Sequence, residues 1–286
     1  MYYETIKQLI RLAGRQKKPI GEIVLAIEAE SENESPNTIR GQMVISWEVM
    51  KQSLDRGVAD NIRSVSGLSG GDAKLFFTRT TKFLSPDISK AVARALGVAE
   101  VNAAMGKIVA CPTAGSCGIV PAALLFAKER LQIDEEEIIT ALFTAAGIGI
   151  VCSMNASISG AEGGCQAECG VAAAMAAGAL TELAGGSATM VGHAVALTLI
   201  NMLGLVCDPV AGLVEIPCIL RNAGALMQAF LAADLALAGI KSRIPVDEVI
   251  GAMREVGQAL PESLRETALG GLANTPTGQR FRRKLA

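Results

Sequence analysis

The stretch LAGGSATMVGHAVALTLINMLGLVC, residues 183–207, decides the fold, because it carries no formal charge from one end to the other. A second uncharged stretch, IITALFTAAGIGIVCSM, covers residues 138–154. Segments this apolar have to be enclosed by lipid or by other parts of the protein. The whole region from residue 138 to residue 221 holds six formal charges, namely Glu162, Glu168, Glu182, Asp208, Glu215 and Arg221.

A membrane protein is one interpretation, since residues 183–207 reach the ~20 residues that span a bilayer. However, both uncharged stretches are rich in small and weakly polar residues rather than Leu and Phe, and His193 lies inside one of them. Flanking belts of Trp and Tyr and an asymmetry of Lys and Arg are missing. We therefore favour a helical core in which small residues let helices approach closely, and we keep an inert membrane or scaffold protein as the alternative.

The patterns of the whole chain indicate an all-α protein. No run alternates every second residue, as a half-buried strand does, and no period marks a repeat protein. We expect one compact multi-helix domain over residues 1–286, with an amphipathic helical part at 1–105 and the core and C-terminal helices at 106–286. Its central helices should be Gly/Ala-rich and buried. Spacing and capping residues predict helices over residues 3–12, 20–27, 38–54, 73–76, 86–96, 223–240 and 245–260.

Composition and charge exclude a nucleic-acid partner. The net charge of -2, the single Trp and the two Tyr leave no basic surface and little area for base stacking. The N-terminal MYYETIKQLIRLAGRQKK has neither the apolar core nor the cleavage site of a signal peptide, so we expect a cytoplasmic protein in a reducing compartment. Disulfides are then unexpected among the seven cysteines.

Four polar, Gly-rich segments interrupt the apolar region, at residues 110–122, 155–170, 207–212 and 216–222. Such loops lose hydration in apolar surroundings unless their backbone groups find partners, and they often line a binding site. The first segment leads into a predicted helix, whose N-terminal N–H groups suit a small anion such as a carboxylate. A plain helix-capping turn is the alternative.

Three cysteines stand at the edges of these loops. Cys165 lies in the second segment. Cys207 stands directly before Asp208-Pro209 and Cys218 directly after Pro217, and the prolines should keep both thiols off regular helices and on short stiff connections. A zinc site would need four closely grouped Cys or His ligands, and the sequence has a single histidine. Three thiolates suit an iron–sulfur cluster with one open iron; simple packing of small residues is the alternative.

Three motifs together carry a family resemblance. CPTAGSCGIVPA at residues 111–122, NASISGAEGGCQAECG at 155–170 and LGLVCDPVAGLVEIPCILRNA at 203–223 resemble the α chain of the iron–sulfur-dependent bacterial L-serine dehydratases, in the two-subunit form. The likeness runs from SGLSGGD at Ser66 to ETALGGLANTPTG near the end. It implies that residues 106–286 bind a [4Fe–4S] cluster through Cys165, Cys207 and Cys218, and that a separate β chain completes a heterodimer. The remaining cysteines then become packing residues: Cys111, Cys117, Cys152 and Cys169.

The resemblance implies a lyase of amino-acid degradation and gluconeogenesis. L-Serine loses water by β-elimination, and the resulting aminoacrylate hydrolyses to pyruvate and ammonia. An open iron, carrying water or a partner-derived ligand at rest, would act as a Lewis acid on the serine hydroxyl. L-Cysteine desulfidase, which resembles the same fold, is the alternative. Our candidates for holding the substrate carboxylate are Thr113, Gly115, Ser116, Asn155, Ser157 and Ser159.

The base that removes the Cα proton is the least determined part of the hypothesis. Glu162 would serve if burial raised its pKa towards neutrality. His193 lies on an apolar helix, which favours a structural role. The third candidate is a group of the β chain, which we prefer because the central region has few titratable residues.

Overall fold

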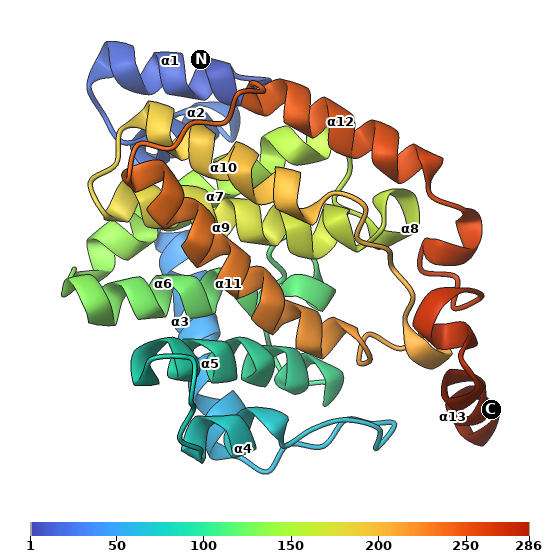
Figure 1. The fold of residues 1–286 in the computed structure, drawn as a ribbon. Coiled ribbons are helices and arrows are strands. Elements are labelled where there is room, and N and C mark those ends of the chain that lie inside the picture. The colour runs from blue at the N-terminus through green and yellow to red at the C-terminus, as the bar shows by residue number, and fades with distance from the viewer. Residues whose placement is uncertain (1, 286) are drawn as a thin grey trace.

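The structure is a computed structural model that describes residues 2–285 and folds them into thirteen α-helices without a strand (Figure 1). The predicted all-α class is confirmed. The helices are α1 Ile6–Gln16, α2 Ile20–Ser31, α3 Pro36–Ala59, α4 Asp72–Thr78, α5 Pro86–Ala103, α6 Ile119–Leu131, α7 Glu135–Asn155, α8 Gly160–Gly163, α9 Val171–Leu183, α10 Ala188–Met202, α11 Cys218–Leu237, α12 Val246–Ala259 and α13 Pro276–Leu285.

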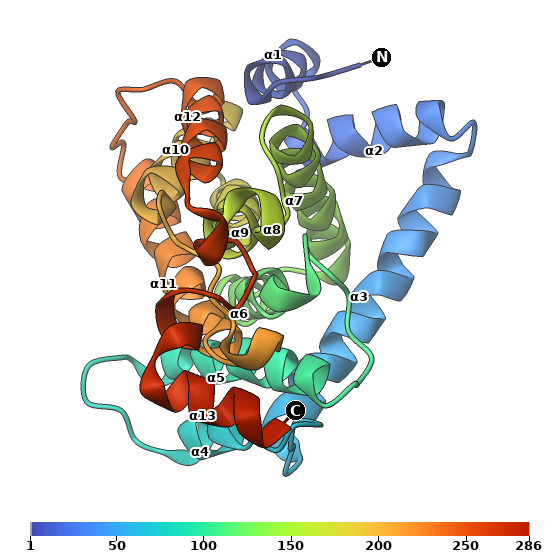
Figure 2. The ribbon, with the colours of Figure 1, turned by 90° about the vertical axis from the view of Figure 1, so that its right-hand side faces the viewer.

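Helix α9 forms the centre of the bundle, and every residue from 171 to 181 is buried. Helices α6, α7, α10 and α11 pack around it (Figure 2). Its small residues make this enclosure possible: a Cβ added at Gly178 would overlap Ile148 of α7 and touch Val191 of α10. The Gly/Ala-rich segment is therefore the buried core helix that the sequence predicts.

Helix α7 is the one described helix whose length and composition would let it cross a membrane. It begins at a capping box, in which the Asp134 carboxylate accepts the Glu137 N–H at 2.9 Å. In its most apolar 18-residue window 67% of the residues are buried, against α2 and α9 among others. Core helices of globular proteins share these properties. Within the other uncharged stretch, residues 183–207, a shorter helix forms, α10.

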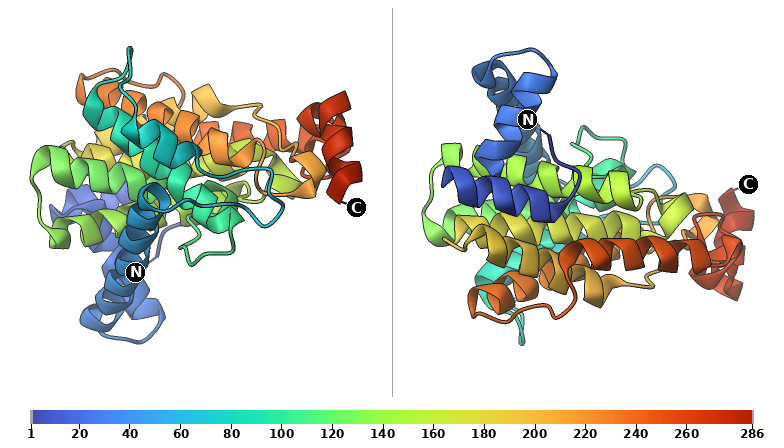
Figure 3. Two further views of the ribbon diagram at one scale, coloured as in Figure 1. Left: turned by 90° about the horizontal axis from the view of Figure 1, so that it is seen from below. Right: turned by 90° about the horizontal axis from the view of Figure 1, so that it is seen from above.

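Helices α2 and α3 project from one side of the bundle, while α13 lies at one end of it (Figure 3). Helix α5 joins the projecting part to the core, because it packs on α3 as well as on α6 and α11. The division at residue 105 and the single-domain organisation stay predictions.

Capping residues place several helix starts where the sequence predicts them. Ser35 and Ser85 each accept a backbone N–H of the first turn, and a proline follows each serine. Helix α5 then runs to Ala103, well beyond the predicted end near Leu96, because its buried face continues to Val101.

Buried carboxylates cap helices that lie far away in the chain. Glu100 of α5 accepts the N–H groups of Gly71, Asp72 and Ala73 at the start of α4. Glu182 of α9 likewise accepts the Ile20 N–H at the start of α2, at 2.7 Å. Burial raises the pKa of both carboxyl groups. These charges are stabilised by helix N-termini instead of by cations.

The crossing of α3 and α5 gives a test of the packing. A Cβ at Gly57 would overlap the Gly97 backbone, so Gly57→Ala should lower the free energy of unfolding by about 1–3 kcal/mol. Gly41 lies in the same helix and would meet nothing within 4 Å, so Gly41→Ala should raise it by up to ~1 kcal/mol. Urea unfolding followed by circular dichroism measures both, and equal effects would contradict the close crossing.

Candidate active site

The thiols of Cys165, Cys207 and Cys218 converge at one end of the central helices. Cys165 immediately precedes the π-helical turn Gln166–Gly170, which leads into α9. Cys207 follows α10, and Cys218 is the first residue of α11. All three are buried, Cys165 and Cys218 both raise the pKa of Cys207, and Cys165 raises the pKa of Cys218, so the three lie within electrostatic range. The site is therefore made from three segments that are remote in the sequence.

The prediction that prolines keep two thiols off regular helices is wrong for Cys218 and agrees with the structure at Cys207. Pro217 does not keep Cys218 off a helix, because α11 begins at Cys218 and not at residue 223. Cys207 does lie on an extended connection, where its N–H donates to the Leu264 carbonyl at 2.9 Å and its carbonyl accepts the Glu266 N–H at 2.7 Å. The C-terminal segment thus fixes the backbone of Cys207.

Glu168 is a site residue that the sequence does not reveal beyond its being one of six charges in an apolar region. Its Oε1 accepts the Thr113 hydroxyl at 2.8 Å, and its Oε2 accepts the Cys207 thiol at 3.6 Å. Burial raises the pKa of this carboxyl group. Glu168 joins the first loop to a predicted cluster ligand.

Two glycines, Gly115 and Gly160, lie close to the Glu168 carboxylate. A Cβ on Gly160 would press on the Glu168 carboxylate and on the Cys207 sulfur, the latter at 2.9 Å. A Cβ on Gly115 would stand 3.4 Å from Glu168 Oε1. Only a residue without a side chain can therefore pack so closely against the Cys207 thiol and the Glu168 carboxylate at position 160.

An ion pair stiffens the loop after Cys207. Arg221 donates to Asp208 Oδ1 at 2.8 Å and to the Val206 carbonyl at 2.7 Å. The other oxygen of Asp208 accepts the Leu272 N–H at 2.7 Å, where Gly271 adopts a positive φ and has no room for a Cβ. The Asp208–Arg221 pair therefore ties the GGLAN segment to the site loop.

The thiols differ in acidity. The pKa of Cys165 lies below its usual range, because the Cys169 thiol hydrogen-bonds to it and the Arg221 guanidinium faces it. Burial raises the pKa of Cys218 to about 12 and raises that of Cys207 as well, with Glu168 adding to both shifts. The Cys169 thiol and the Arg221 guanidinium thus favour the thiolate form of Cys165.

Asn222 fixes the loop of residues 113–118 by hydrogen bonds. Its Oδ1 accepts the Gly118 N–H at 3.0 Å, and its Nδ2 donates to the carbonyls of Gly115 and Cys218 at 2.8 and 2.9 Å. Thr113 and Ser116 form the predicted capping turn before α6, and Thr113 also reaches Glu168. Of the candidate residues, Thr113, Gly115 and Ser116 therefore lie beside the thiols, although one N–H of the helix entrance is already bound.

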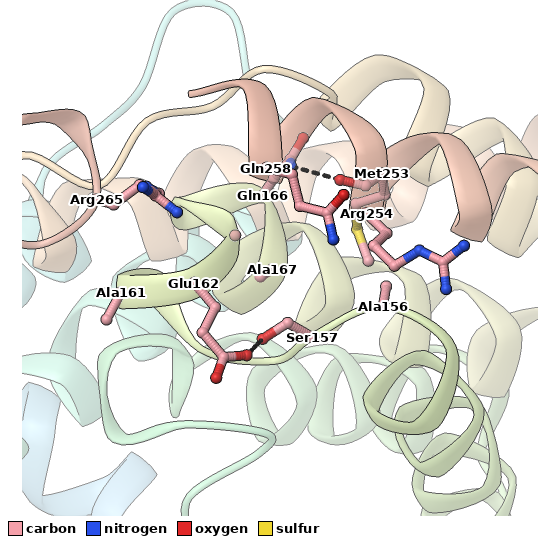
Figure 4. A pocket seen from close by; sticks show the side chains of 11 residues that line it. Ala156, Ser157, Ala161, Glu162, Gln166, Ala167, Met253, Arg254, Gln258 and Arg265 are labelled. Atoms are coloured by element: carbon pink, nitrogen blue, oxygen red, sulfur yellow. Dashed lines mark hydrogen bonds between the residues drawn. The ribbon is translucent and has the colours of Figure 1, made fainter. Parts of the chain in front are cut away.

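The hydrogen bonds of the other candidates go to groups other than the thiols. Asn155 donates to the Glu4 and Val151 carbonyls, and the Ser159 N–H donates to Ser157. Ser157 donates to Glu162 at 2.7 Å, and both line a separate cavity (Figure 4). Glu162 is exposed, so the structure does not provide the burial on which its proposed role as base depends.

His193 lies on α10 and is partly buried. Burial and the neighbouring Lys241 lower its pKa. None of the thiol-site residues contributes to that shift, which agrees with the structural role that its apolar helix indicates.

The comparisons with known proteins identify the family. A family model described as "Serine dehydratase alpha chain" matches residues 15–273. The chain belongs to this family. It is 49% identical to a probable L-serine dehydratase alpha chain of Bacillus subtilis, covering 99% of this chain and 95% of that one. It is 45% identical to the L-serine dehydratase alpha chain of Peptoniphilus asaccharolyticus, over 98% and 97% of the two chains.

A longer relative also matches this serine dehydratase alpha chain. The L-serine dehydratase of Helicobacter pylori is 38% identical over 96% of this chain, which corresponds to 62% of that protein. The resemblance predicted from the three motifs is thereby confirmed. The individual site residues stay predictions.

The thiol site of this alpha chain fits an iron–sulfur cluster better than a single metal ion. Among residues 2–285, no three His, Cys, Asp or Glu side chains are grouped closely enough for one ion. A cluster places irons and sulfides between its cysteines, so its thiolates stand further apart than ligands around one metal. Three buried, soft sulfur donors match the ligand type that iron–sulfur clusters use.

Substitution of Glu162 and Glu168 tests which of these two carboxylates matters for the active site. Glu168→Ala removes the link between Thr113 and Cys207, so we expect kcat/KM for L-serine to fall by about 100-fold through misplacement of the site loops. Glu162→Ala should cause a smaller loss, because its side chain is exposed and bonded to Ser157. Steady-state kinetics on anaerobically purified enzyme measure both. If Glu162 is the base, the order of the two losses reverses.

Proposed function

We propose that this chain is the catalytic alpha subunit of an L-serine dehydratase, a lyase that converts L-serine to pyruvate and ammonia. The observation that carries the proposal is the convergence of three buried thiols from three separate segments in a chain of this family. The printed names of the alpha-chain relatives support the substrate.

A [4Fe–4S] cluster held by Cys165, Cys207 and Cys218 would complete the site. When bound, it supplies a Lewis acid that stabilises the hydroxide leaving from Cβ. The residues of this chain supply the surroundings. The thiols are at most 7% exposed, so the elimination would take place away from bulk water, where fixed polar groups act more strongly.

Positioning of the substrate would depend on the loop of residues 113–118. Asn222 fixes its backbone, and Glu168 fixes the Thr113 hydroxyl, so the loop presents polar groups in one arrangement beside the thiols. A serine carboxylate held by Thr113, Gly115 and Ser116 would lie next to the cluster. This arrangement converts binding energy into orientation of the Cα–H and Cβ–O bonds.

We further propose a separate β chain as partner, in a cytoplasmic heterodimer. The term alpha chain in the names of the relatives supports a partner, and the longer Helicobacter pylori protein has further sequence in the same polypeptide. Both oxygens of Glu168 already accept hydrogen bonds, and Glu162 is exposed. These contacts favour a proton-accepting group contributed by the partner.

Cysteine substitution tests the cluster. Cys165→Ala, Cys207→Ala and Cys218→Ala should each reduce bound iron and sulfide and abolish serine turnover, because each removes a ligand. Cys152→Ala is the matched control: its thiol is also fully buried but belongs to α7, and we expect iron content near that of the wild type. Iron and sulfide are quantified on anaerobically prepared protein coexpressed with the β chain. Equal iron loss in all four variants would contradict the ligand assignment.

The leaving group distinguishes the proposed reaction from cysteine desulfidation. We expect release of pyruvate from L-serine with kcat/KM at least about tenfold higher than from L-cysteine, because the polar loop beside the thiols suits a hydroxyl better than a second thiol. Pyruvate, ammonia and sulfide are measured with each amino acid. A preference for L-cysteine would replace the proposed activity with that of a desulfidase.

A further inference from the structure

A cavity of about 300 Å³ lies between α8 and α12, and Figure 4 shows the side chains that line it. Gly160, at the start of α8, faces Cys207 and Glu168, whereas Ala161, Glu162 and Gly163 line the cavity. Its other walls come from α12 and from the C-terminal segment at Arg265. The volume is at the lower limit of small-molecule sites, so a compact ligand is required.

Arg265 gives the cavity its main unsatisfied group. Its Nε is buried and has no hydrogen-bond partner among the described residues. A second guanidinium, that of Arg254, also lines the cavity. A guanidinium has a planar array of donors that matches a carboxylate, so the two arginines of the lining suit an acidic ligand.

Glu162 supplies a charge of the opposite sign. Ser157 donates to its Oε2 at 2.7 Å, and this bond turns the carboxylate towards the loop, as Figure 4 shows. The other oxygen, Oε1, has capacity to accept from a cation. A ligand with one carboxylate and one ammonium group would therefore be complementary to Arg265 and Glu162 together.

Two buried residues that follow Cys165 in the chain, Gln166 and Ala167, line the cavity. Gln166 is 1% exposed, donates to the Met253 carbonyl at 2.9 Å and accepts the Gly204 N–H at 2.9 Å. Ala167 beside it is equally buried. The lining includes neither the three thiols nor residues 113–118, so the cavity differs from the substrate site proposed above.

From these contacts we propose that the cavity is a second ligand site, which binds a small zwitterionic α-amino acid through Arg265 and Glu162. The residues on either side of Arg265 pair with the backbone of Cys207. Occupation of the cavity therefore acts on the segment that holds a predicted cluster ligand, and any coupling between the two sites is reciprocal.

Equilibrium dialysis of the anaerobic αβ enzyme with radiolabelled L-alanine tests the proposal. L-Alanine has the zwitterionic group but no leaving group on Cβ, so it is not consumed. We expect Arg265→Gln to reduce the number of alanine molecules bound per alpha chain by one, or to weaken one class of site by at least about tenfold. Unchanged stoichiometry and affinity in this variant would overturn the proposal.

Two further variants guard against an effect of misfolding. Ala161→Leu fills the cavity and keeps all its charges, so it should remove the same alanine site. Arg243→Gln makes the same substitution at an exposed arginine outside the cavity and should leave alanine binding as in the wild type. Alanine binding that survives in Ala161→Leu would also overturn the assignment.

Pyruvate tests the ammonium contact. It has the carboxylate without the amino group, so the Arg265-dependent site should bind it more weakly than L-alanine. Glu162→Gln should reduce this preference by about three- to fivefold. Tighter binding of pyruvate than of L-alanine would overturn the amino-acid assignment. Serine turnover is assayed separately, so absence of dehydratase activity and absence of the second site are distinguishable results.

Discussion

Polar backbone inside an apolar core has to find hydrogen-bond partners, and the whole architecture depends on this requirement. Asn222 meets it for the loop of residues 113–118, Asp208 for the C-terminal GGLAN segment, and Gln166 for the end of α10 and for α12. These three side chains are 0%, 3% and 1% exposed. Each joins segments that are distant in the chain, so loops without regular structure of their own are held by the core.

The small residues of α9 bring the thiol segments together. A short turn joins α9 to α10, so the two helices run antiparallel and the end of α10 returns to the start of α9. The Gln166 N–H donates to the Leu205 carbonyl at 2.9 Å at this point. Cys165 and Cys207 therefore lie near each other, and α11, which packs on both helices, adds Cys218.

Local patterns were sufficient for the fold class and for much of the secondary structure. The uncharged stretches indicate buried helices, and Ser35 and Ser85 indicate helix starts, because both signals act through neighbouring residues. Other features depend on partners far away in the sequence. They are the start of α11 at Cys218, the capping of α4 by Glu100 and the hydrogen bonds from Asn222 to the loop of residues 113–118. No local pattern encodes such partners, so they become visible only in the folded chain.

Glu162 and Glu168 show how folding gives different roles to residues of one type. They are six positions apart in one motif, and the sequence offers no reason to prefer the second. Between them, α8 ends at a glycine with positive φ and a π-helical turn begins, and this change of direction sends Glu162 to the surface and Glu168 inwards to Thr113 and Cys207. Because Glu168 accepts a bond at each oxygen, it acts through the residues that it holds. The proposal that the β chain contributes the proton acceptor agrees with a site in which Glu168 holds neighbouring residues and Glu162 is exposed.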